Sequence, residues 1–272
     1  MSITKANGIN IYYEIHGEGE PLVLIQGYGS NSSSWISQVM VFSRKYKVIT
    51  FDNRGTGRSD KPDISYTTKT MAEDVKGLLD ILDIDAAHIC GASMGGLIAQ
   101  EFAINSPKQV ISLILACTHC GGTHAITRGP VSNENLFDEE RMKQITERQR
   151  MEGQLPFLFS PGFIKTHPNI LDNMMAQRLE YPTPLHGYKR QAEAIMHHDT
   201  YNRLPQIKAP TLIIHGAADP GVLVANARIL SSRIPDAELV ILKGLRHAFV
   251  AEKPEEVHRI ILDFLRRHPR SI

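Results

Sequence analysis

The sequence predicts an α/β fold, in which a mostly parallel β-sheet is covered by helices on both faces. The first observation is that short apolar runs alternate with helix-like stretches over residues 1–118 and again over residues 207–272. The second is that these runs are apolar at nearly every position, which is typical of strands buried on both faces of a parallel sheet. A chain of 272 residues is long enough for one large domain that carries an insertion.

The first half of the chain contains the clearest elements. Strands are expected where Ile, Val, Leu and Tyr gather between turn residues, at 10–16, 22–26, 46–51, 87–92 and 110–116. Helices are expected where apolar side chains recur at helical spacing or where a proline ends the run, at 68–82 and 94–105. A short turn-rich segment separates the first two strands, and we expect them to run antiparallel.

Residues 119–206 break this alternation, because they contain helix-like segments and no convincing strand. The expected helices are punctuated by prolines and lie at 138–151, 169–180 and 185–198. Alternation then resumes with strands at 211–215 and 238–242 and helices at 222–233 and 255–267. We therefore expect a core made of residues 1–118 and 207–272, with a helical insertion at 119–206 that lies over the sheet.

Composition excludes several classes of partner. The chain has 30 basic and 29 acidic residues, so no bulk charge favours nucleic acid or an anionic membrane surface. The N-terminal segment lacks the apolar run of a signal peptide, and the longest apolar stretch, near 110–117, is too short to span a bilayer. Three cysteines are too few for a disulfide framework. We expect a cytoplasmic protein acting on a small molecule, and the sequence does not indicate an oligomeric state.

A pentapeptide at the end of one expected strand points to nucleophilic catalysis. Gly91-Ala92-Ser93-Met94-Gly95 matches the pattern G-x-S-x-G, with a strand running into it and a helix running out of it. Such a turn holds the serine in strained backbone angles and exposes its hydroxyl above the carboxyl end of the sheet. The alternative is a glycine-rich turn in which Ser93 only caps the helix.

With this turn in place, the sequence resembles the α/β-hydrolase superfamily over essentially its full length. Three further segments carry the resemblance. Gln26-Gly27-Tyr28-Gly29 is similar to the H-G-x-G turn, Asp52 to Ser59 to the D-x-R-G-x-G-x-S loop, and His215 to Pro220 with Arg246-His247 to the acid and histidine loops. Small serine esterases and enol-lactonase-like members are the most similar. The resemblance implies a mostly parallel eight-stranded sheet flanked by helices, and it makes residues 119–206 the cap, or lid, subdomain.

The general base must be chosen among 12 histidines. His247 follows an expected strand and precedes the last helix, and the chain order Ser, Asp, His is the order of this fold. Asp219, in the loop after the strand that contains His215, is the expected acid that orients His247 and stabilises its charged form. Asp236 is the rival acid, but it is typical of a turn, and His215 is expected to be structural.

Acyl transfer also needs hydrogen-bond donors for the developing oxyanion. The backbone N–H of Met94 is one expected donor, and the resemblance makes the backbone N–H of Tyr28 the other. Gln26 stands where the family usually has histidine, so we expect altered hydrogen bonding in this turn without loss of activity. Arg246 replaces the small residue that commonly precedes the histidine, which changes the expected shape of the pocket mouth.

Other signals point elsewhere but are weaker. Cys117 and Cys120, with His124 nearby, have the spacing of metal or redox ligands, yet no second cysteine pair exists and the motif ends a strand. We expect neither a metal nor a cofactor. Asp52 and Arg54 are expected to hold their loop by local hydrogen bonds, and the Gly55-Thr56-Gly57 segment lacks the setting of a nucleotide-binding loop.

The expected function is cleavage of a carboxylic ester or lactone through an acyl-enzyme intermediate. Serine at the turn, where haloalkane and epoxide hydrolases have aspartate, argues against those branches. Three alternatives stay open: a carbon–carbon bond hydrolase acting on a β-diketone-like substrate, a perhydrolase, and a non-catalytic ligand receptor that retains the triad.

Overall fold

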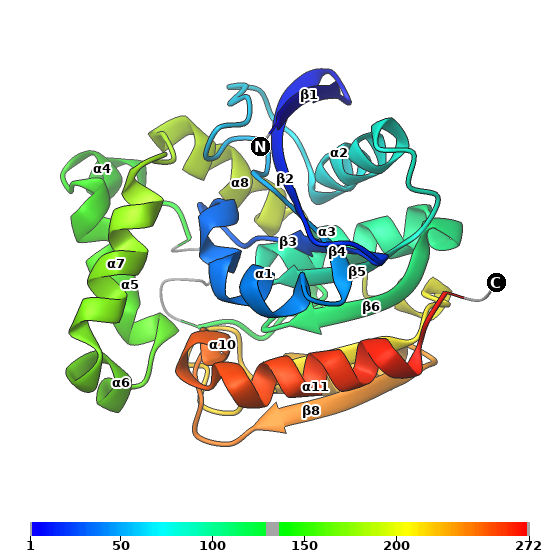
Figure 1. Ribbon diagram of the computed structural model, residues 1–272. Coiled ribbons are helices and arrows are strands. Elements are labelled where there is room, and N and C mark those ends of the chain that lie inside the picture. The colour runs from blue at the N-terminus through cyan, green and yellow to red at the C-terminus, as the bar shows by residue number, and fades with distance from the viewer. Residues whose placement is uncertain (1, 129–135, 271–272) are drawn as a thin grey trace.

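As predicted, eight strands form one mostly parallel sheet. Their order in the sheet is β1-β2-β4-β3-β5-β6-β7-β8. The computed structural model describes residues 2–128 and 136–270 (Figure 1). Strands β3 to β8 run parallel, whereas β2 is antiparallel to both β1 and β4. The strands are β1 (Ser2–Ala6), β2 (Ile9–His16), β3 (Glu20–Ile25), β4 (Tyr46–Phe51), β5 (Ala87–Ala92), β6 (Val110–Ala116), β7 (Thr211–Gly216) and β8 (Ala237–Leu242).

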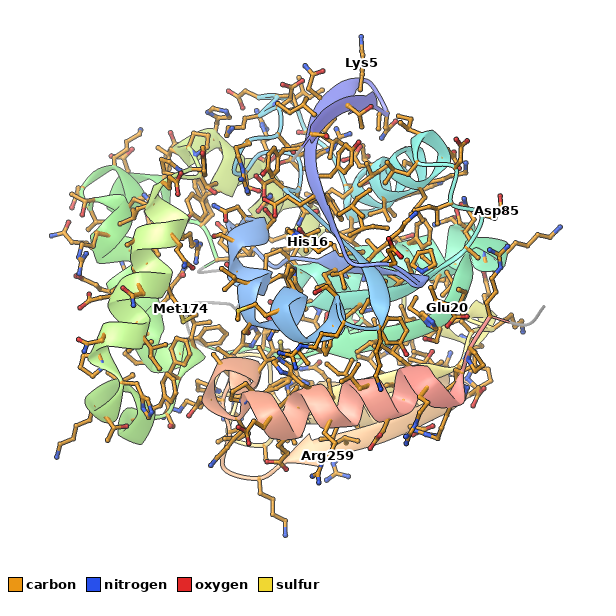
Figure 2. The ribbon with its side chains drawn as sticks, in the orientation of Figure 1. Lys5, His16, Glu20, Asp85, Met174 and Arg259 are labelled. Carbon is orange, nitrogen blue, oxygen red and sulfur yellow. The ribbon has the colours of Figure 1, made fainter. Side chains whose placement is uncertain are left out.

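Helices cover both faces of this sheet (Figure 1). One face packs against α1 (Ile36–Phe42), α10 (Phe249–Glu252) and α11 (Pro254–Arg267). The other packs against α2 (Thr68–Ile81), α3 (Met94–Asn105) and α9 (Ala225–Arg233). In α11 the apolar residues face the sheet, whereas Arg259 projects outward (Figure 2). This amphipathic pattern fixes α11 against the core, whereas α3 is buried on nearly all sides.

The beginning of the chain differs in detail from the prediction. The first two predicted strands, β2 and β3, do run antiparallel, but they are not neighbours, because β4 lies between them. The preceding strand β1 was not predicted. It lies at the sheet edge and is mostly exposed, and Figure 2 shows Lys5 projecting from it into solvent. Such an edge strand carries little of the apolar pattern that reveals buried strands.

Between β6 and β7 the described residues form five helices, which lie beyond the carboxyl ends of the parallel strands (Figure 1). They are α4 (Glu139–Lys143), α5 (Glu147–Leu158), α6 (Pro161–Thr166), α7 (Pro168–Leu179) and α8 (Leu185–Met196). We call them the α4–α8 helices. Met174, seen on α7 in Figure 2, packs with Phe159 and Phe163 in a small apolar cluster that also contacts Ala248 and Ala251 of the core. Residues 129–135 of the predicted insertion lie outside the described ranges.

The single helix predicted at 138–151 is wrong. Helix α4 ends at Lys143, and α5 begins after Thr146, whose hydroxyl accepts from the Gln149 backbone while the Gln149 side chain accepts from the Thr146 backbone. This reciprocal capping starts a new helix inside one long charged run of sequence. Short 3-10 turns complete the described structure: η1 (Ser32–Trp35), η2 (Pro107–Gln109), η3 (Gly122–His124) and η5 (Leu204–Gln206).

The two chain segments that lead into and out of the α4–α8 helices are paired with each other. Gly121 and Asp199 form an antiparallel bridge. The Gly122 N–H donates to the His198 carbonyl at 2.8 Å, and the Thr200 N–H donates to the Cys120 carbonyl at 2.9 Å. We call this pairing the neck. It brings the start and the end of the helical segment together above the sheet.

No helix in residues 2–128 and 136–270 is both long and apolar enough to cross a membrane.

Candidate active site

Ser93 stands on a sharp turn between β5 and α3. Its backbone has φ 55° and ψ −120°, a conformation that is strained for any residue with a side chain. A methyl group on Gly91 would collide with the Gly95 carbonyl, and one on Gly95 would collide with the Ile25 carbonyl at the end of β3. Glycine at both positions therefore lets strand and helix approach closely enough to form the turn. The Ser93 side chain is left half-buried at the carboxyl edge of the sheet.

The segment after β6 fixes this turn from the other side. The Ser93 N–H donates to the Ala116 carbonyl at 2.9 Å, and the Thr118 hydroxyl donates to the Ser93 carbonyl at 2.8 Å. Cys117, between these two partners, has φ 43° and is buried. The strained serine is thus held through both of its backbone polar groups.

Asp219 and His247 meet over the same edge of the sheet. Asp219 follows β7 and His247 follows β8, and the His247 Nδ1–H donates to Asp219 Oδ2 at 2.6 Å. The other Asp219 oxygen accepts from the backbone N–H groups of Gly221 and Val222, both at 3.0 Å. With its side chain fully buried, this carboxylate has a single orientation, and it fixes the tautomer in which His247 Nε2 is free to accept a proton.

The surroundings of His247 favour its charged form. Burial alone would lower the pKa of His247, but the Cys117 sulfur and the Asp219 carboxylate outweigh burial and raise the pKa above its ordinary value. Phe157, near the end of α5, lies against the imidazole with ring centroids 4.6 Å apart. The Ala248 N–H donates to the Leu158 carbonyl at 2.8 Å, and Arg246 contacts the Pro156 carbonyl. The α4–α8 helices therefore adjoin the histidine loop directly.

Among the described residues, no hydrogen bond joins the Ser93 hydroxyl to the His247 ring. The structure therefore brings Asp219 and His247 into contact, and it places Ser93 on a neighbouring turn without a hydrogen bond from its hydroxyl to the histidine. Hydrogen bonds of this kind are often long or misaligned before substrate binds.

His215 has a structural role, as expected. Its Nε2–H donates to the Val222 carbonyl at 2.8 Å, and the same nitrogen lies 3.6 Å from Asp219 Oδ2. Burial lowers the pKa of His215, so the ring is neutral at pH 7. It braces the loop that carries Asp219.

The turn after β3 contains one of the expected oxyanion donors. The Gln26 side chain accepts from the N–H of Gly27 at 2.8 Å, and the Gln26 carbonyl accepts from Asn53 at 2.9 Å. The Gln26 side chain thus takes part directly in the hydrogen bonding of this turn. A methyl group on Gly27 would lie 3.2 Å from Ser93 Cβ, so the turn is packed against the serine. Met94, whose N–H is the other expected donor, is buried at the first position of α3.

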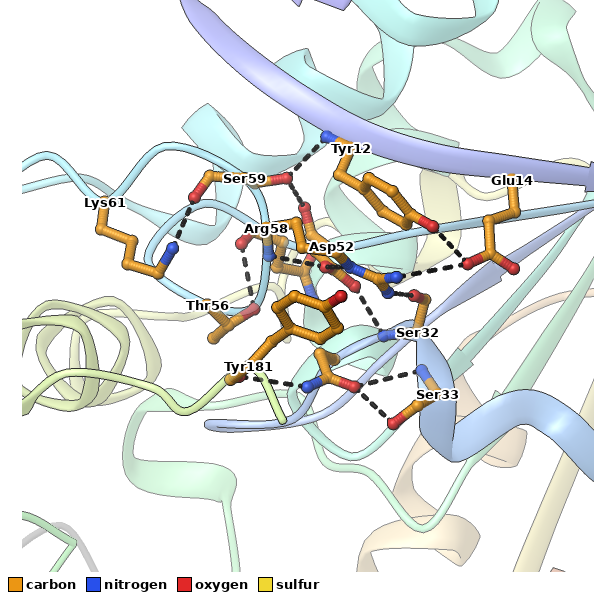
Figure 3. Close-up of polar contacts among 12 residues, drawn as sticks. Tyr12, Glu14, Ser32, Ser33, Asp52, Thr56, Arg58, Ser59, Lys61 and Tyr181 are labelled. Carbon is orange, nitrogen blue, oxygen red and sulfur yellow. Dashed lines mark hydrogen bonds and ion pairs between the residues drawn. The ribbon is translucent and has the colours of Figure 1, made fainter. Parts of the chain in front are cut away.

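The loop after β4 is structural. Asp52 accepts from the Ser32 N–H at 2.7 Å and from the Arg58 N–H at 2.8 Å and its Nε at 3.0 Å (Figure 3). The Arg58 guanidinium lies between two aromatic rings, 3.5 Å from the Tyr12 centroid and 4.5 Å from that of Tyr181, which follows α7 (Figure 3). Asp52 thus holds its own loop, as predicted, and Arg58 connects that loop to the segment between α7 and α8.

Arg54 departs from the expectation of purely local hydrogen bonds. Its Nε donates to Asp74 Oδ2 of α2 at 2.5 Å, and both side chains are buried. The ion pair joins the loop to a helix 20 residues further along the chain.

The residues that sequence reasoning missed belong to the α4–α8 helices, to the segment between α7 and α8, and to the loop after β6. They are Phe157, which covers His247, Cys117, which raises its pKa, and a group that contacts Gly29: Arg178, Thr183 and Gln191. The Gly29 and Gln191 partners are 162 positions apart, so no local spacing could have paired them.

Comparison with known proteins decides the family. Residues 20–254 match the family model of the alpha/beta hydrolase fold, which is well over half of the chain. The chain belongs to the alpha/beta hydrolase family. This alpha/beta hydrolase is 30% identical over 264 residues to 3-oxoadipate enol-lactonase 2 of Acinetobacter baylyi, with 96% of this chain and 95% of the relative covered.

Two solved structures are similar to this alpha/beta hydrolase over nearly their whole length. The enol-lactonase from Burkholderia xenovorans superposes with a TM-score of 0.87 at 27% identity, covering 97% of this chain and 99% of the other. A thermophilic esterase from Thermogutta terrifontis superposes with a TM-score of 0.87 at 25% identity, covering 99% and 100%. The activities named for these relatives are hydrolytic, which supports hydrolase activity in this chain.

Proposed function

We propose that this alpha/beta hydrolase cleaves carboxylic esters or lactones through an acyl-enzyme intermediate on Ser93, with the α4–α8 helices as a cap over the site. The observation that carries the proposal is the 2.6 Å hydrogen bond between Asp219 and His247 at the sheet edge where Ser93 occupies its strained turn. A hydroxyl is a weak nucleophile at neutral pH, and an oriented imidazole is the base that activates it.

The proposed reaction has two steps. Ser93 Oγ attacks the substrate carbonyl carbon while His247 Nε2 takes the hydroxyl proton. The Met94 and Tyr28 N–H groups donate to the oxyanion of the tetrahedral intermediate. His247 then gives its proton to the departing alkoxide, which leaves an ester on Ser93. Water attacks this ester with His247 again as base, and the acid product leaves as Ser93 regains its proton.

The cycle requires a hydrogen bond from Ser93 Oγ to His247 Nε2, and we expect it to form when substrate binds. Rotation about the serine Cα–Cβ bond moves Oγ without disturbing the fixed backbone. The orientation of His247 is already set by Asp219, so the hydroxyl is the group that has to move.

Lactones and esters are favoured by the relatives. An enol-lactonase and an esterase, both similar over nearly the whole chain, act on carbonyl–oxygen bonds according to their names. Ring opening of a lactone is the same reaction with the leaving alkoxide tethered to the acyl group. The substrate is accordingly proposed to be a small-molecule ester or lactone.

The test is labelling with a fluorophosphonate probe, followed by a panel of p-nitrophenyl esters and lactones. We expect the wild type to be labelled and to hydrolyse at least one short ester or lactone, and Ser93→Ala to lose both properties. Labelling that survives Ser93→Ala would exclude Ser93 as nucleophile. Turnover of a dienoic β-diketone without ester hydrolysis would instead assign carbon–carbon bond cleavage. Tight ligand binding with no turnover of any substrate would indicate a receptor.

A further inference from the structure

The turn that presents the Tyr28 amide is a β-turn spanning Gly27 to Ser30. The Ser30 N–H donates to the Gly27 carbonyl at 3.3 Å, which closes the turn weakly, and Gly29 has φ 61° at its third position. The Gly27 carbonyl belongs to the same peptide unit as the Tyr28 N–H. Whatever fixes the geometry of this turn therefore fixes the direction of that N–H.

The α7–α8 region holds this turn through both backbone polar groups of Gly29. The Gly29 N–H donates to the Gln191 side-chain oxygen at 2.8 Å. The Gly29 carbonyl accepts from Arg178 Nη2 at 2.8 Å and from the Thr183 hydroxyl at 3.0 Å. Three side chains far along the chain thus determine the orientation of the peptide groups that flank one glycine.

Gln191 is itself fixed in a single orientation. It is fully buried on α8, and its Nε2 donates to the Arg54 carbonyl at 2.9 Å. Its amide therefore bridges two core loops, one after β3 and one after β4. Because the nitrogen has an acceptor and the oxygen has a donor, the reverse orientation of the amide would break both bonds.

Tyr188 of α8 packs directly against the turn at Gly29. A methyl group on Gly29 would collide with the ring of Tyr188, which is fully buried on α8 and lies edge-to-face against Tyr28 with centroids 5.3 Å apart. If the helices moved away, both backbone polar groups of Gly29 would lose these partners, and only the weak Gly27–Ser30 bond and the contacts of Gln26 and Gly27 with the core would hold the turn. The shape of the turn therefore depends on side chains from the α4–α8 helices.

We propose that Gln191 is a positioning residue for the oxyanion hole, which holds the Gly27–Ser30 turn so that the Tyr28 N–H faces the reacting carbonyl. This inference rests on the proposed function, since it concerns the same oxyanion. Docking of the α4–α8 helices then does more than shape the pocket, because it also completes the catalytic machinery.

The experiment compares three variants on a p-nitrophenyl ester that the wild type hydrolyses. Gln191→Met removes both amide hydrogen bonds at nearly constant volume. Thr183→Val removes one of the two donors to the Gly29 carbonyl. Ser160→Ala is the matched control, because it removes the side-chain cap of α6 and its contact with Glu252 of the core without touching the turn. The readouts are kcat, KM, and the inhibition constant of an alkyl boronic acid that forms a tetrahedral adduct on Ser93.

Losing an oxyanion donor outright lowers kcat by a factor of about 10²–10³, so a displaced donor is expected to lower it about tenfold in Gln191→Met. The boronic acid should bind about tenfold more weakly as well, because its adduct uses the same donors. Acylation and deacylation both pass through an oxyanion, so both steps should slow to a similar extent. KM should therefore change less than twofold. Thr183→Val should show the same pattern at about threefold, and Ser160→Ala should leave kcat and the inhibition constant unchanged.

The outcomes separate this inference from the proposed function. Absence of ester and lactone turnover in the wild type, with Ser93 unlabelled, refutes the proposed function and this inference with it. Turnover in the wild type with a raised KM but unchanged kcat in Gln191→Met would make Gln191 a substrate-binding residue and overturn the inference alone. Equal losses of kcat in Ser160→Ala would overturn it too. If Gln191→Met is insoluble, Thr183→Val decides, and unchanged kcat and inhibition there refute the inference.

Discussion

Replacing the carboxylate of Asp219 by an amide separates its role in folding from its role in catalysis. In Asp219→Asn, the side-chain oxygen can still accept from the Gly221 and Val222 N–H groups, at 3.0 Å in the wild type. The amide nitrogen then faces His247 Nδ1, where the carboxylate oxygen stood at 2.6 Å. Two donors cannot pair, so the ring takes the other tautomer and Nε2 carries a proton.

A histidine protonated at Nε2 cannot accept the proton of Ser93. We therefore expect kcat of Asp219→Asn to fall by a factor of about 10³–10⁴, which is about 4–5.5 kcal/mol in the barrier. The unfolding midpoint should change little, because the loop keeps its two backbone hydrogen bonds. The assay is steady-state hydrolysis of the best ester or lactone, paired with urea denaturation.

The rival acid is the control for this prediction. Asp236 is exposed at the turn before β8, and Asp236→Asn should retain kcat within about twofold of the wild type, as surface changes distant from a site usually do. Two results would refute the role given to Asp219: Asp219→Asn keeping more than a tenth of wild-type kcat, or Asp236→Asn losing as much activity as Asp219→Asn does.

Three further predictions concern pH dependence, the loop after β4 and the serine turn. His247 must be neutral to act as base and its pKa is raised, so kcat/KM should increase with pH, with a midpoint above pH 6.5. Cys117→Ala should shift this midpoint to lower pH in a profile measured from pH 5 to 10. An unshifted midpoint would exclude the Cys117 sulfur as a cause of the raised pKa. Arg58→Met leaves the fully buried Asp52 carboxylate without its cation and should lower the free energy of unfolding by about 3 kcal/mol in urea denaturation. The control, Lys76→Met, breaks an exposed ion pair with Asp80 and should lower it by less than about 0.5 kcal/mol. Equal losses in both variants would contradict the effect of burial. Gly95→Ala should lose at least about 2 kcal/mol of stability together with activity, because the added methyl collides with the Ile25 carbonyl. The control, Gly153→Ala, has nothing within 4 Å of the added methyl and should gain about 0.5–1 kcal/mol of stability. A stability change of the same sign in both variants would refute the steric interpretation.

The elements that the sequence predicted well are those whose pattern is set by burial. Strands β4, β5 and β6 and helix α3 match the predicted bounds, because a continuous apolar run that ends in turn residues or proline is characteristic of a buried element. Strand β1 escaped because an exposed edge needs no such run. The break between α4 and α5 escaped because Thr146 and Gln149 form a capping box that a long charged stretch conceals.

The candidate site divides in the same way. Asp219 and His247 could be chosen from strand ends and chain order, since the carboxyl ends of parallel strands gather at one edge. The partners of Gly29 could not, because each pairing depends on how helices far along the chain dock onto the core. The influence of Cys117 on His247 was hidden for a similar reason: the fold brings the ends of separate strands together, while the sequence offers only a C-x-x-C spacing.

The neck has a consequence for exchanging parts between related enzymes. Its antiparallel bridge between Gly121 and Asp199 places both junctions of the helical segment next to each other, so the segment can be cut out and replaced at two neighbouring points while every sheet strand stays intact. With the proposed role of these helices as a cap, pocket shape and substrate range would be transferred together with the exchanged segment. A donor piece must, however, carry an acceptor where Gln191 meets the Gly29 amide. Chimaeras that lack this acceptor should bind their new substrates but turn them over slowly. Restoring glutamine at the position of Gln191 should then raise their turnover.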